Sequence, residues 1–202
     1  VGNYQIICPI NTRILPDGAT CGNRAGAACY RQGCVSPLGL ARTILQQRGW
    51  RRYAGALRLI VANSHALAQT LRANGVEVGR VIWNGTRPQP ARPPLRSPPT
   101  VTFAGRLVAK KGADVLFRAM TLVVRRLPGA RLLVIGDGEE RPRLERLIRE
   151  YALGNHVTMA GHLVRPELDQ QLGAAWVHAV PSRYPEPFSN TVTEAMMRGT
   201  AV

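Results

Sequence analysis

Residues 100–136 read TVTFAGRLVAKKGADVLFRAMTLVVRRLPGARLLVIG, and this stretch decides the fold of the chain. It predicts a short apolar strand over 100–104, an amphipathic helix over 112–129 that stops at a Pro-Gly pair, and a buried strand over 130–136. Strands that alternate with helices at this spacing lie parallel in one sheet. The stretch therefore predicts an α/β protein.

The same alternation continues to the end of the chain. We expect strands over 156–161 and 176–181, a further strand beginning at 200, and helices over 139–154, 166–175 and 190–199. Parallel strands with helices between them form doubly wound sheets, in which ligands bind beyond the carboxyl ends of the strands. The loops expected at that edge are 105–112, 136–142, 161–165 and 181–190.

The two halves of the chain are separated by a stretch rich in proline. Residues 88–99 hold six prolines, and we expect a stiff, extended linker there. Ahead of the linker we expect helices over 38–57 and 66–75 and strands over 58–64 and 78–85. We therefore predict a first domain over 1–87, a linker over 88–99 and a second domain over 100–202, each domain being part of a doubly wound parallel sheet that is incomplete in this chain.

Positive charge is concentrated in the first half. The formal net charge is +15, and residues 1–100 carry 13 Arg against Asp17 and Glu77, a balance of +11. Such a surface attracts anionic partners, which can be a phosphorylated substrate, a membrane surface or a nucleic acid. Aromatic residues make up only 5% of the chain and are not interleaved with the arginines, which disfavours a nucleic-acid-binding module.

All four cysteines lie in a loop-rich region near the start, at Cys8, Cys21, Cys29 and Cys34. Four clustered thiolates can hold a structural zinc ion, although no C-x2-C knuckle is present; disulfides or four reduced thiols are the alternatives. No run approaches the roughly 20 apolar residues that span a bilayer. The first residues also lack the pattern of a signal peptide, so we expect a cytoplasmic protein.

The loop 105–112 offers two cations to an anionic ligand. Gly105 permits close approach of the backbone, while Arg106 and Lys111 lie five positions apart. Arg presents a planar fork and Lys a compact point charge, so together they can neutralise a diphosphate without a metal ion. The alternative is that both are solvated charges beside a helix start.

The stretch 181–196 carries two carboxylates, Glu186 in a proline-braced loop and Glu194 on the helix that follows. Backbone amides at Ser189, Asn190 and Thr191 open this helix and can receive an anion. A carboxylate beside such a site can accept hydrogen bonds from sugar hydroxyls. The alternative for Glu194 is a capping box with Thr191, and for Glu186 an exposed loop acid.

Five motifs in order resemble the family 4 retaining glycosyltransferases, nucleotide-sugar-dependent enzymes with the GT-B fold of two Rossmann-like domains. They are GRLVAKKG (105–112), VIGDGEE (134–140), VTMAGHL (157–163), VPSRYPEPF (180–188) and TEAMMRGTAV (193–202). The resemblance covers residues 100–202 densely. It extends thinly to ANS (62–64), WNG (83–85) and the cysteine region, so it implies that 1–87 is the later part of an acceptor domain and 100–202 the nucleotide-sugar domain.

The resemblance implies roles at the phosphate and sugar end of the donor. Arg106 and Lys111, beside Gly105, match the pair that binds the donor diphosphate and stabilises the leaving group. Glu186 matches the first acid of a Glu-x7-Glu motif and would lie at the transferred sugar, with Phe188 also in contact with substrate. In this reading Arg106, Lys111 and Glu186 are the catalytic residues.

Further roles are implied along the nucleoside. Glu194 matches the second acid, which bonds the ribose hydroxyls, while the helix-opening residues Ser189, Asn190 and Thr191 would lie under the phosphates. The loop beside the nucleobase is matched by Gly161, His162 and Leu163. Ser189 stands where the family usually has glycine, which would strain a left-handed backbone at that position. His178, inside an apolar strand, we expect to be a core residue rather than a catalyst.

The reaction implied is transfer of a sugar from a UDP-, GDP- or ADP-sugar to a hydroxyl of a glycan or lipid-linked acceptor, with retention of configuration. The resemblance thus implies a bacterial polysaccharide or glycolipid biosynthetic activity. No Asp-x-Asp pair is present, so we expect no catalytic metal or other cofactor. The basic first half could contact anionic lipid at the inner membrane face, and no nucleic acid is expected as a partner. The alternatives are a GT-B sugar-nucleotide epimerase, a basic nucleic-acid-binding module, and a chain that is inactive by itself.

Overall fold

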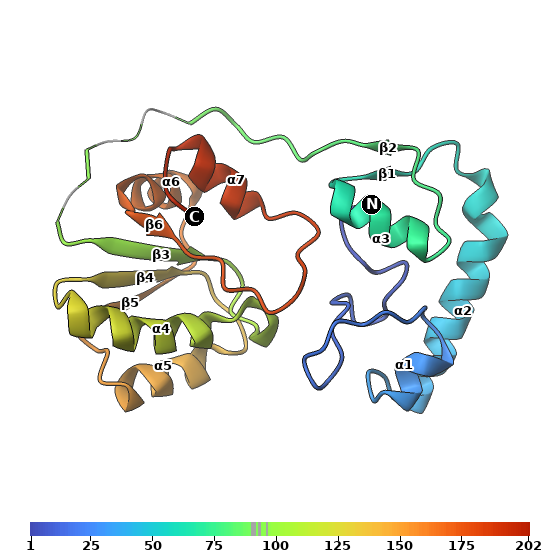
Figure 1. Cartoon of the computed structure of the whole chain (residues 1–202), viewed down its shortest axis with the longest axis horizontal. Helices are drawn as coiled ribbons and strands as arrows, with labels where there is room; N and C mark the ends of the chain where they lie inside the picture. Colours follow the sequence, from blue (N-terminus) through green and yellow to red (C-terminus); the bar gives the residue numbers. More distant parts are fainter. Residues whose placement is uncertain (90–91, 93, 96) are drawn as a thin grey trace. The chain divides into compact units, whose positions relative to one another are not determined.

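The computed structural model describes residues 1–202 except 90, 91, 93 and 96. The chain divides into two compact units (Figure 1). The first comprises Val1–Gly85 together with Tyr184–Phe188, and the second comprises Thr86–Arg183 together with Ser189–Val202. Part of the predicted linker 88–99 lies outside the described residues.

The first unit is built from short strands and longer helices. Its elements are α1 (Ala27–Arg31), α2 (Pro37–Tyr53), η1 (Ala54–Ala56), β1 (Val61–Ala62), α3 (His65–Ala73) and β2 (Arg80–Val81). β1 and β2 pair in parallel, with Val61 opposite Arg80. Each strand is much shorter than expected, because backbone pairing beyond the ladder is limited to bonds such as the one from the Gly79 amide to the Ile60 carbonyl at 2.9 Å.

Side-chain caps start both long helices of this unit. Ser36 accepts a hydrogen bond from the Gly39 amide at 3.2 Å, and Pro37 follows at the first position of α2. Ser64 accepts from the Leu67 amide at 3.1 Å and so caps α3, as its sequence position predicts. The buried face of α3 packs with Tyr4 and other apolar residues into the core of the unit.

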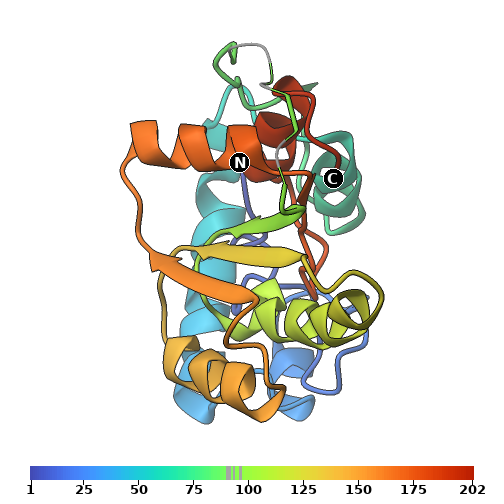
Figure 2. The ribbon, with the colours of Figure 1, turned by 90° about the vertical axis from the view of Figure 1, so that its left-hand side faces the viewer.

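The second unit is a parallel, doubly wound sheet, as predicted. Its strands are β3 (Thr100–Ala104), β4 (Arg131–Ile135), β5 (Val157–Gly161) and β6 (Val177–His178), in the order β5-β4-β3-β6. Its helices are η2 (Ala109–Lys111), α4 (Ala113–Arg126), α5 (Arg141–Glu150), α6 (Arg165–Ala174) and α7 (Asn190–Met197). Figure 2 shows α4 and α5 on one face of the sheet and α6 and α7 on the other.

The core of the second unit lies between the sheet and α4. Phe117 and Met120 of α4 are fully buried against Leu132 and Val134 of β4. Burial of each such side chain contributes about 1.5–3 kcal/mol relative to leaving it in water. This apolar layer holds the sheet register, in which Phe103 lies opposite Val134 and Thr100 opposite Arg131.

The last predicted strands are short. The stretch 176–181 forms a ladder only at Val177–His178, and the strand expected from 200 is a single parallel bridge between Val177 and Ala201. Pro181 is the last residue of the stretch 176–181, and proline lacks the amide proton that a ladder requires. All paired strands of the sheet run parallel, so their carboxyl ends lie along one edge.

Candidate functional site

Backbone hydrogen bonds join three loops at the carboxyl edge of the second unit. The Gly105 amide donates to the Ile135 carbonyl at 2.9 Å, and the Leu107 amide donates to the Asp137 carbonyl at 2.9 Å. The Gly136 amide donates to the Gly161 carbonyl at 2.7 Å. The loops that follow β3, β4 and β5 therefore continue the sheet beyond its strands and form a rigid floor.

Gly136 makes this close approach possible. Its φ is +126°, and a Cβ atom built on it would lie 2.1 Å from the Gly105 carbonyl oxygen. No side chain fits there without moving backbone, so glycine is required at this position. The loop 136–142, which the strand pattern assigns to the ligand edge, therefore begins at a position that only glycine can occupy.

A hollow of about 360 Å³ opens above this floor. It brings together five of the predicted site residues, from loops far apart in the sequence: Gly105, Arg106, His162, Leu163 and Thr191. Backbone glycines and a cation line one side, and the loop after β5 and the start of α7 line the other. This is the arrangement expected at the carboxyl edge of a doubly wound sheet.

The lining residues that the sequence prediction did not name include Leu168 and Asp137. Leu168 of α6 forms part of its wall, and Asp137 lies in the loop after β4. In the sequence Leu168 is one of several apolar residues of a short helix, and only the packing of α6 directs it to the hollow. The signal for Asp137 is its place in the loop 136–142, which the strand pattern assigns to the ligand edge.

Lys111 lies on a turn that is fixed against the loop after β6. The Arg183 amide donates to the Lys110 carbonyl at 2.9 Å, and a Cβ on Gly112 would lie 2.1 Å from the Pro181 carbonyl oxygen. Lys111 is the last residue of η2, and it is not among the residues that line the hollow. Arg106 therefore lines the hollow, whereas Lys111 lies on a separate turn that the loop after β6 holds in place.

The start of α7 corrects two expectations about the residues at 189–194. Ser189 is the N-cap residue and makes no side-chain capping bond, so Thr191 is the second helical residue and Glu194 the fifth. A capping box between Thr191 and Glu194 is therefore wrong, since it would need Thr191 at the N-cap. Ser189 has φ −100° and ψ 105°, an extended conformation that serine adopts without strain.

Glu194 is instead paired with α6. Its Oε1 accepts a hydrogen bond from Arg165 Nη1 at 2.9 Å, and its side chain is 17% exposed. Asn190 lies at the exposed start of the same helix. The carboxylate therefore lies in the second unit, on the helix whose first turn contributes Thr191 to the hollow.

Glu186 and Phe188 belong to the first unit. They lie in the segment Tyr184–Phe188, which the chain enters from Arg183 and leaves at Ser189. Ser64, the residue that caps α3, donates its hydroxyl proton to the Pro187 carbonyl oxygen at 2.5 Å. The structure therefore groups Glu186 and Phe188 with α3, and the residues of the hollow with the second unit.

His178 is a buried core residue, as expected, but it is only partly satisfied. It is 1% exposed, and its Nδ1 lies 3.1 Å from the Thr102 hydroxyl. Its Nε2 has no hydrogen-bond partner among the residues that the structure describes. Burial lowers the pKa of His178 to about 4, although the Glu194 carboxylate acts in the opposite direction. The imidazole is therefore neutral at pH 7.

The cysteine region offers no ready metal site. All four cysteines are free thiols, with Cys8 and Cys29 buried. Burial raises the pKa of the Cys34 thiol, and the neighbouring Cys29 adds to this effect. Within the described part of the chain, no three His, Cys, Asp or Glu side chains are arranged to hold a metal ion. A structural zinc ion in this region stays a prediction.

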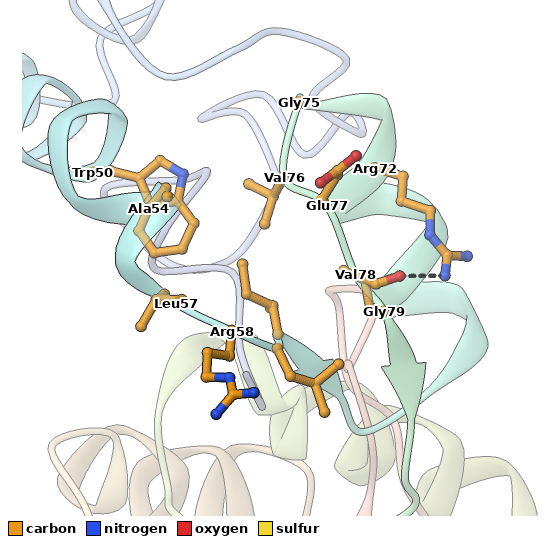
Figure 3. Close-up of a pocket in the computed structure, with 13 residues that line it drawn as sticks. Trp50, Ala54, Leu57, Arg58, Arg72, Gly75, Val76, Glu77, Val78 and Gly79 are labelled. Atoms are coloured by element: carbon orange, nitrogen blue, oxygen red, sulfur yellow. Dashed lines mark hydrogen bonds between the residues drawn. The ribbon is translucent and has the colours of Figure 1, made fainter.

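A second, larger hollow of about 860 Å³ lies in the first unit. Figure 3 shows Trp50, Leu57 and Val76 on its walls, with Arg58 at one side and the Arg72 guanidinium donating to the Val78 carbonyl. The hollow lies beside the segments that lead into β1 and β2, and therefore at the amino ends of these strands. Ligands of open α/β sheets bind at the opposite ends, so volume alone does not make it the candidate site.

None of the helices in the described part of the chain is long and apolar enough to cross a bilayer.

Sequence comparison identifies relatives for the second half of the chain. A family model described as "Glycosyl transferases group 1" matches residues 88–202, more than half of the chain. The chain is 36% identical over 104 residues to the GDP-mannose-dependent alpha-(1-6)-phosphatidylinositol monomannoside mannosyltransferase of Mycobacterium tuberculosis, a match that covers 48% of this chain and 27% of that protein. It is 31% identical over 131 residues to glycogen synthase of the same organism, covering 65% and 30% respectively. The chain thus spans less than a third of the length of these relatives.

Comparison with solved structures shows that this chain also resembles glycosyltransferases in its fold. Sucrose-phosphate synthase from Thermosynechococcus elongatus superposes with a TM-score of 0.61 and 32% identity, covering 70% of this chain and 39% of that chain. Anabaena HepE in complex with UDP-glucose superposes with a TM-score of 0.64 and 23% identity, covering 83% and 48%. These neighbours are GT-B glycosyltransferases, and the predicted GT-B fold is confirmed.

Proposed function

Because the chain belongs to the glycosyl transferases group 1 family, we propose that it is part of a family 4 enzyme that transfers a hexose from a nucleoside diphosphate sugar to an acceptor hydroxyl with retention of configuration. One observation carries the proposal. The hollow at the carboxyl edge of the second unit joins Arg106 and His162, which come from two different family motifs, to Thr191 at the helix start between the last two motifs. A nucleotide is the ligand that such an edge accommodates best.

In this proposal the diphosphate of the donor binds between the loop after β3 and the start of α7. Arg106 supplies a forked guanidinium at the hollow, and Lys111 supplies a point charge on its braced turn. The first amides of α7 supply partial positive charge, because they have no partners within the helix. These groups stabilise the negative charge that develops on the leaving diphosphate, which is the role a divalent cation plays in other transferases.

The nucleoside end of the donor would lie toward β5 and α6. Gly161, His162 and Leu163 flank the base, and Leu168 adds an apolar surface against which a planar base can pack. Glu194 accepts hydrogen bonds from the ribose hydroxyls. Glu186, carried by the first unit, acts at the transferred sugar together with Phe188. Asn190 belongs with Ser189 and Thr191 to the phosphate-binding helix start.

The acceptor is a glycan or a lipid-linked saccharide bound by the first unit. The mycobacterial mannosyltransferase is named for a phosphatidylinositol mannoside, an anionic glycolipid. The excess of 13 Arg over Asp17 and Glu77 in residues 1–100 gives this chain a surface that attracts such a headgroup. We infer a peripheral contact with anionic membrane on the cytoplasmic side, with the first unit toward the lipid.

Calorimetric titration of the chain with UDP, GDP and ADP tests the donor site. We expect one of the three to bind, and Arg106→Ala to weaken its binding about tenfold or more, because a charge-assisted contact to phosphate is worth on the order of 1.5–3 kcal/mol. The matching nucleoside without phosphates should bind both proteins equally.

Arg118→Ala is the matched control, since Arg118 is an exposed arginine on α4 away from the hollow. It should leave the affinity unchanged. Failure of all three nucleotides to bind, or an equal loss in both variants, would contradict the proposed site.

A further inference from the structure

Four charged side chains connect α6 to α7 beside the candidate site. Arg165 Nη1 donates to Glu194 Oε1 at 2.9 Å, and Arg165 Nε donates to the Asp169 carboxylate at 3.0 Å. Arg198 donates one guanidinium nitrogen to Asp169 and the other to the Glu194 carbonyl oxygen, the latter at 2.9 Å. These four residues form what we call the α6–α7 network.

The network determines how Arg165 is oriented. Arg198 is only 2% exposed, and it fixes Asp169 from the protein interior. Asp169 lies four residues after Arg165 on the same helix face and holds the guanidinium through Nε. The remaining edge of the guanidinium is directed to Glu194. The hydrogen bonds that Arg165 donates to Glu194 and, with a smaller effect, to Asp169 raise the pKa of Arg165, which is consistent with a well-matched pair.

Glu194 has a nearly buried side chain and needs a positive partner. The buried His178 cannot supply one at neutral pH, because its imidazole is uncharged there. Arg198 bonds the backbone of Glu194 and not its carboxylate. Arg165 is therefore the side chain that neutralises Glu194, and it engages only Oε1. The contact with Arg165 is made through Oε1, so Arg165 leaves the second carboxylate oxygen to other partners.

Both ends of the pair are adjacent to the hollow. Leu168 lies three residues after Arg165 on α6, and Thr191 lies three residues before Glu194 on α7. Residues three apart on a helix share a face, and both Leu168 and Thr191 line the hollow. The Arg165–Glu194 pair thus lies at the side of the hollow that α6 and α7 form together.

We propose that Arg165 is a positioning residue of the nucleoside site, which holds Glu194 through Oε1 so that the other carboxylate oxygen accepts hydrogen bonds from the vicinal hydroxyls of a ribose. This inference rests on the proposed function and assigns a residue to it. Arg165 acts through Glu194, and the α6–α7 network keeps the carboxylate in one orientation before the ligand arrives. Preorganisation of this kind reduces the entropic cost of binding.

The test is a double-mutant cycle read by calorimetry with the nucleoside diphosphate that the chain binds. Arg165→Ala and Glu194→Gln should each weaken binding about tenfold, and the double variant should bind no more weakly than Glu194→Gln alone. The 2′,3′-dideoxy analogue should bind Arg165→Ala and the unmodified chain equally, since it offers no hydroxyl to Glu194. Arg165→Lys should recover only part of the affinity, because an ammonium lacks the fork that joins Asp169 and Glu194.

Two controls separate positioning from folding. Arg146→Ala removes an exposed arginine of α5 and should change neither affinity nor melting temperature. Arg165→Gln keeps a hydrogen-bond donor on α6 and should show the same loss of affinity with a melting temperature close to that of the unmodified chain.

Three outcomes overturn the inference. In the first, Arg165→Ala binds the nucleotide as the unmodified chain does. In the second, it loses the ribonucleotide and the dideoxy analogue equally, which means direct contact with the phosphates or a folding effect. In the third, the losses in the double variant add. If the unmodified chain binds no nucleoside diphosphate, the proposed function fails and the inference fails with it, which distinguishes that case from the other three.

Discussion

The two units of this chain use the same elements, parallel strands with helices packed on them, but they hold their loops differently. In the second unit the loops after β3, β4 and β5 are joined backbone to backbone, and Gly136 lies against the Gly105 carbonyl. In the first unit the ladder between β1 and β2 covers two residue pairs, and a larger hollow lies at the amino ends of these strands. A ligand site depends on fixed geometry more than on volume, and fixed geometry is present in the second unit.

The largest effect on the rigid loops of the second unit is expected from a side chain at Gly136. Gly136→Ala combines a positive φ with a Cβ atom placed 2.1 Å from the Gly105 carbonyl oxygen, which is far shorter than a van der Waals contact. We expect a loss of about 3 kcal/mol in the free energy of unfolding, measured by urea denaturation, and loss of nucleotide binding.

Gly55→Ala in the first unit is the matched control. A Cβ atom at Gly55 meets nothing within 4 Å, and the change should alter stability by less than about 0.5 kcal/mol. Equal effects of the two substitutions would show that the joined loops do not confer the rigidity we assign to them.

The buried His178 offers a second, smaller contrast with the exposed His65 of α3. The pKa of His178 is about 4 in the folded chain and about 6.5 when unfolded, so the unfolded state takes up a proton first as the pH falls. The stability that the chain has with an uncharged His178 is therefore fully present above pH 6.5, and it is lost as the pH falls toward 4. Glu194 opposes this shift and Arg198 adds to it.

We expect His178 to account for about 2 kcal/mol of destabilisation between about pH 7 and pH 4.5, measured by urea denaturation at each pH. His178→Leu should remove that part of the pH dependence. His65→Gln, on the surface of the first unit, should leave the dependence unchanged. A pH profile that His178→Leu does not alter would contradict the burial of an uncharged imidazole.

The smallest expected effect concerns the cap residue that also bonds the Glu186 segment. Ser64→Ala removes the cap of α3 and the bond to the Pro187 carbonyl, with an expected loss of about 1–2 kcal/mol. Ser64→Asp keeps a capping acceptor but cannot donate to that carbonyl when ionised, so it separates the two contributions.

Ser36→Ala, which removes only the cap of α2, should cost about 1 kcal/mol or less. Thermal unfolding of the four proteins provides the comparison. If Ser64→Ala is no more destabilising than Ser36→Ala, the bond to Pro187 does not contribute to the stability of the first unit.

Much of the second unit could be predicted from its sequence. The strand and helix positions in 100–161 follow from the apolar periodicity, because each element buries one face against a single core. Large apolar residues such as Phe117 and Val134 mark that face. The loops that meet at the ligand edge follow from the parallel order of the strands. Short elements were harder to predict, since the stretches 58–64 and 176–181 each hold a run of apolar residues without a clear period, and the available partners decide which residues pair.

The sequence by itself determined the α/β class, the parallel sheet and the loops at its carboxyl edge. It also pointed to three residues that line the hollow: Arg106 and His162 through the family motifs, and Thr191 through the helix start between the last two motifs. These are local patterns, and local patterns follow from propensity and periodicity. Only the tertiary structure decided that Thr191 does not cap its helix, that Leu168 faces the hollow, and that Arg165 is the partner of Glu194. Each of these depends on how one helix packs against another, and Arg165 and Glu194 are separated by 29 positions of sequence that carry no sign of the contact.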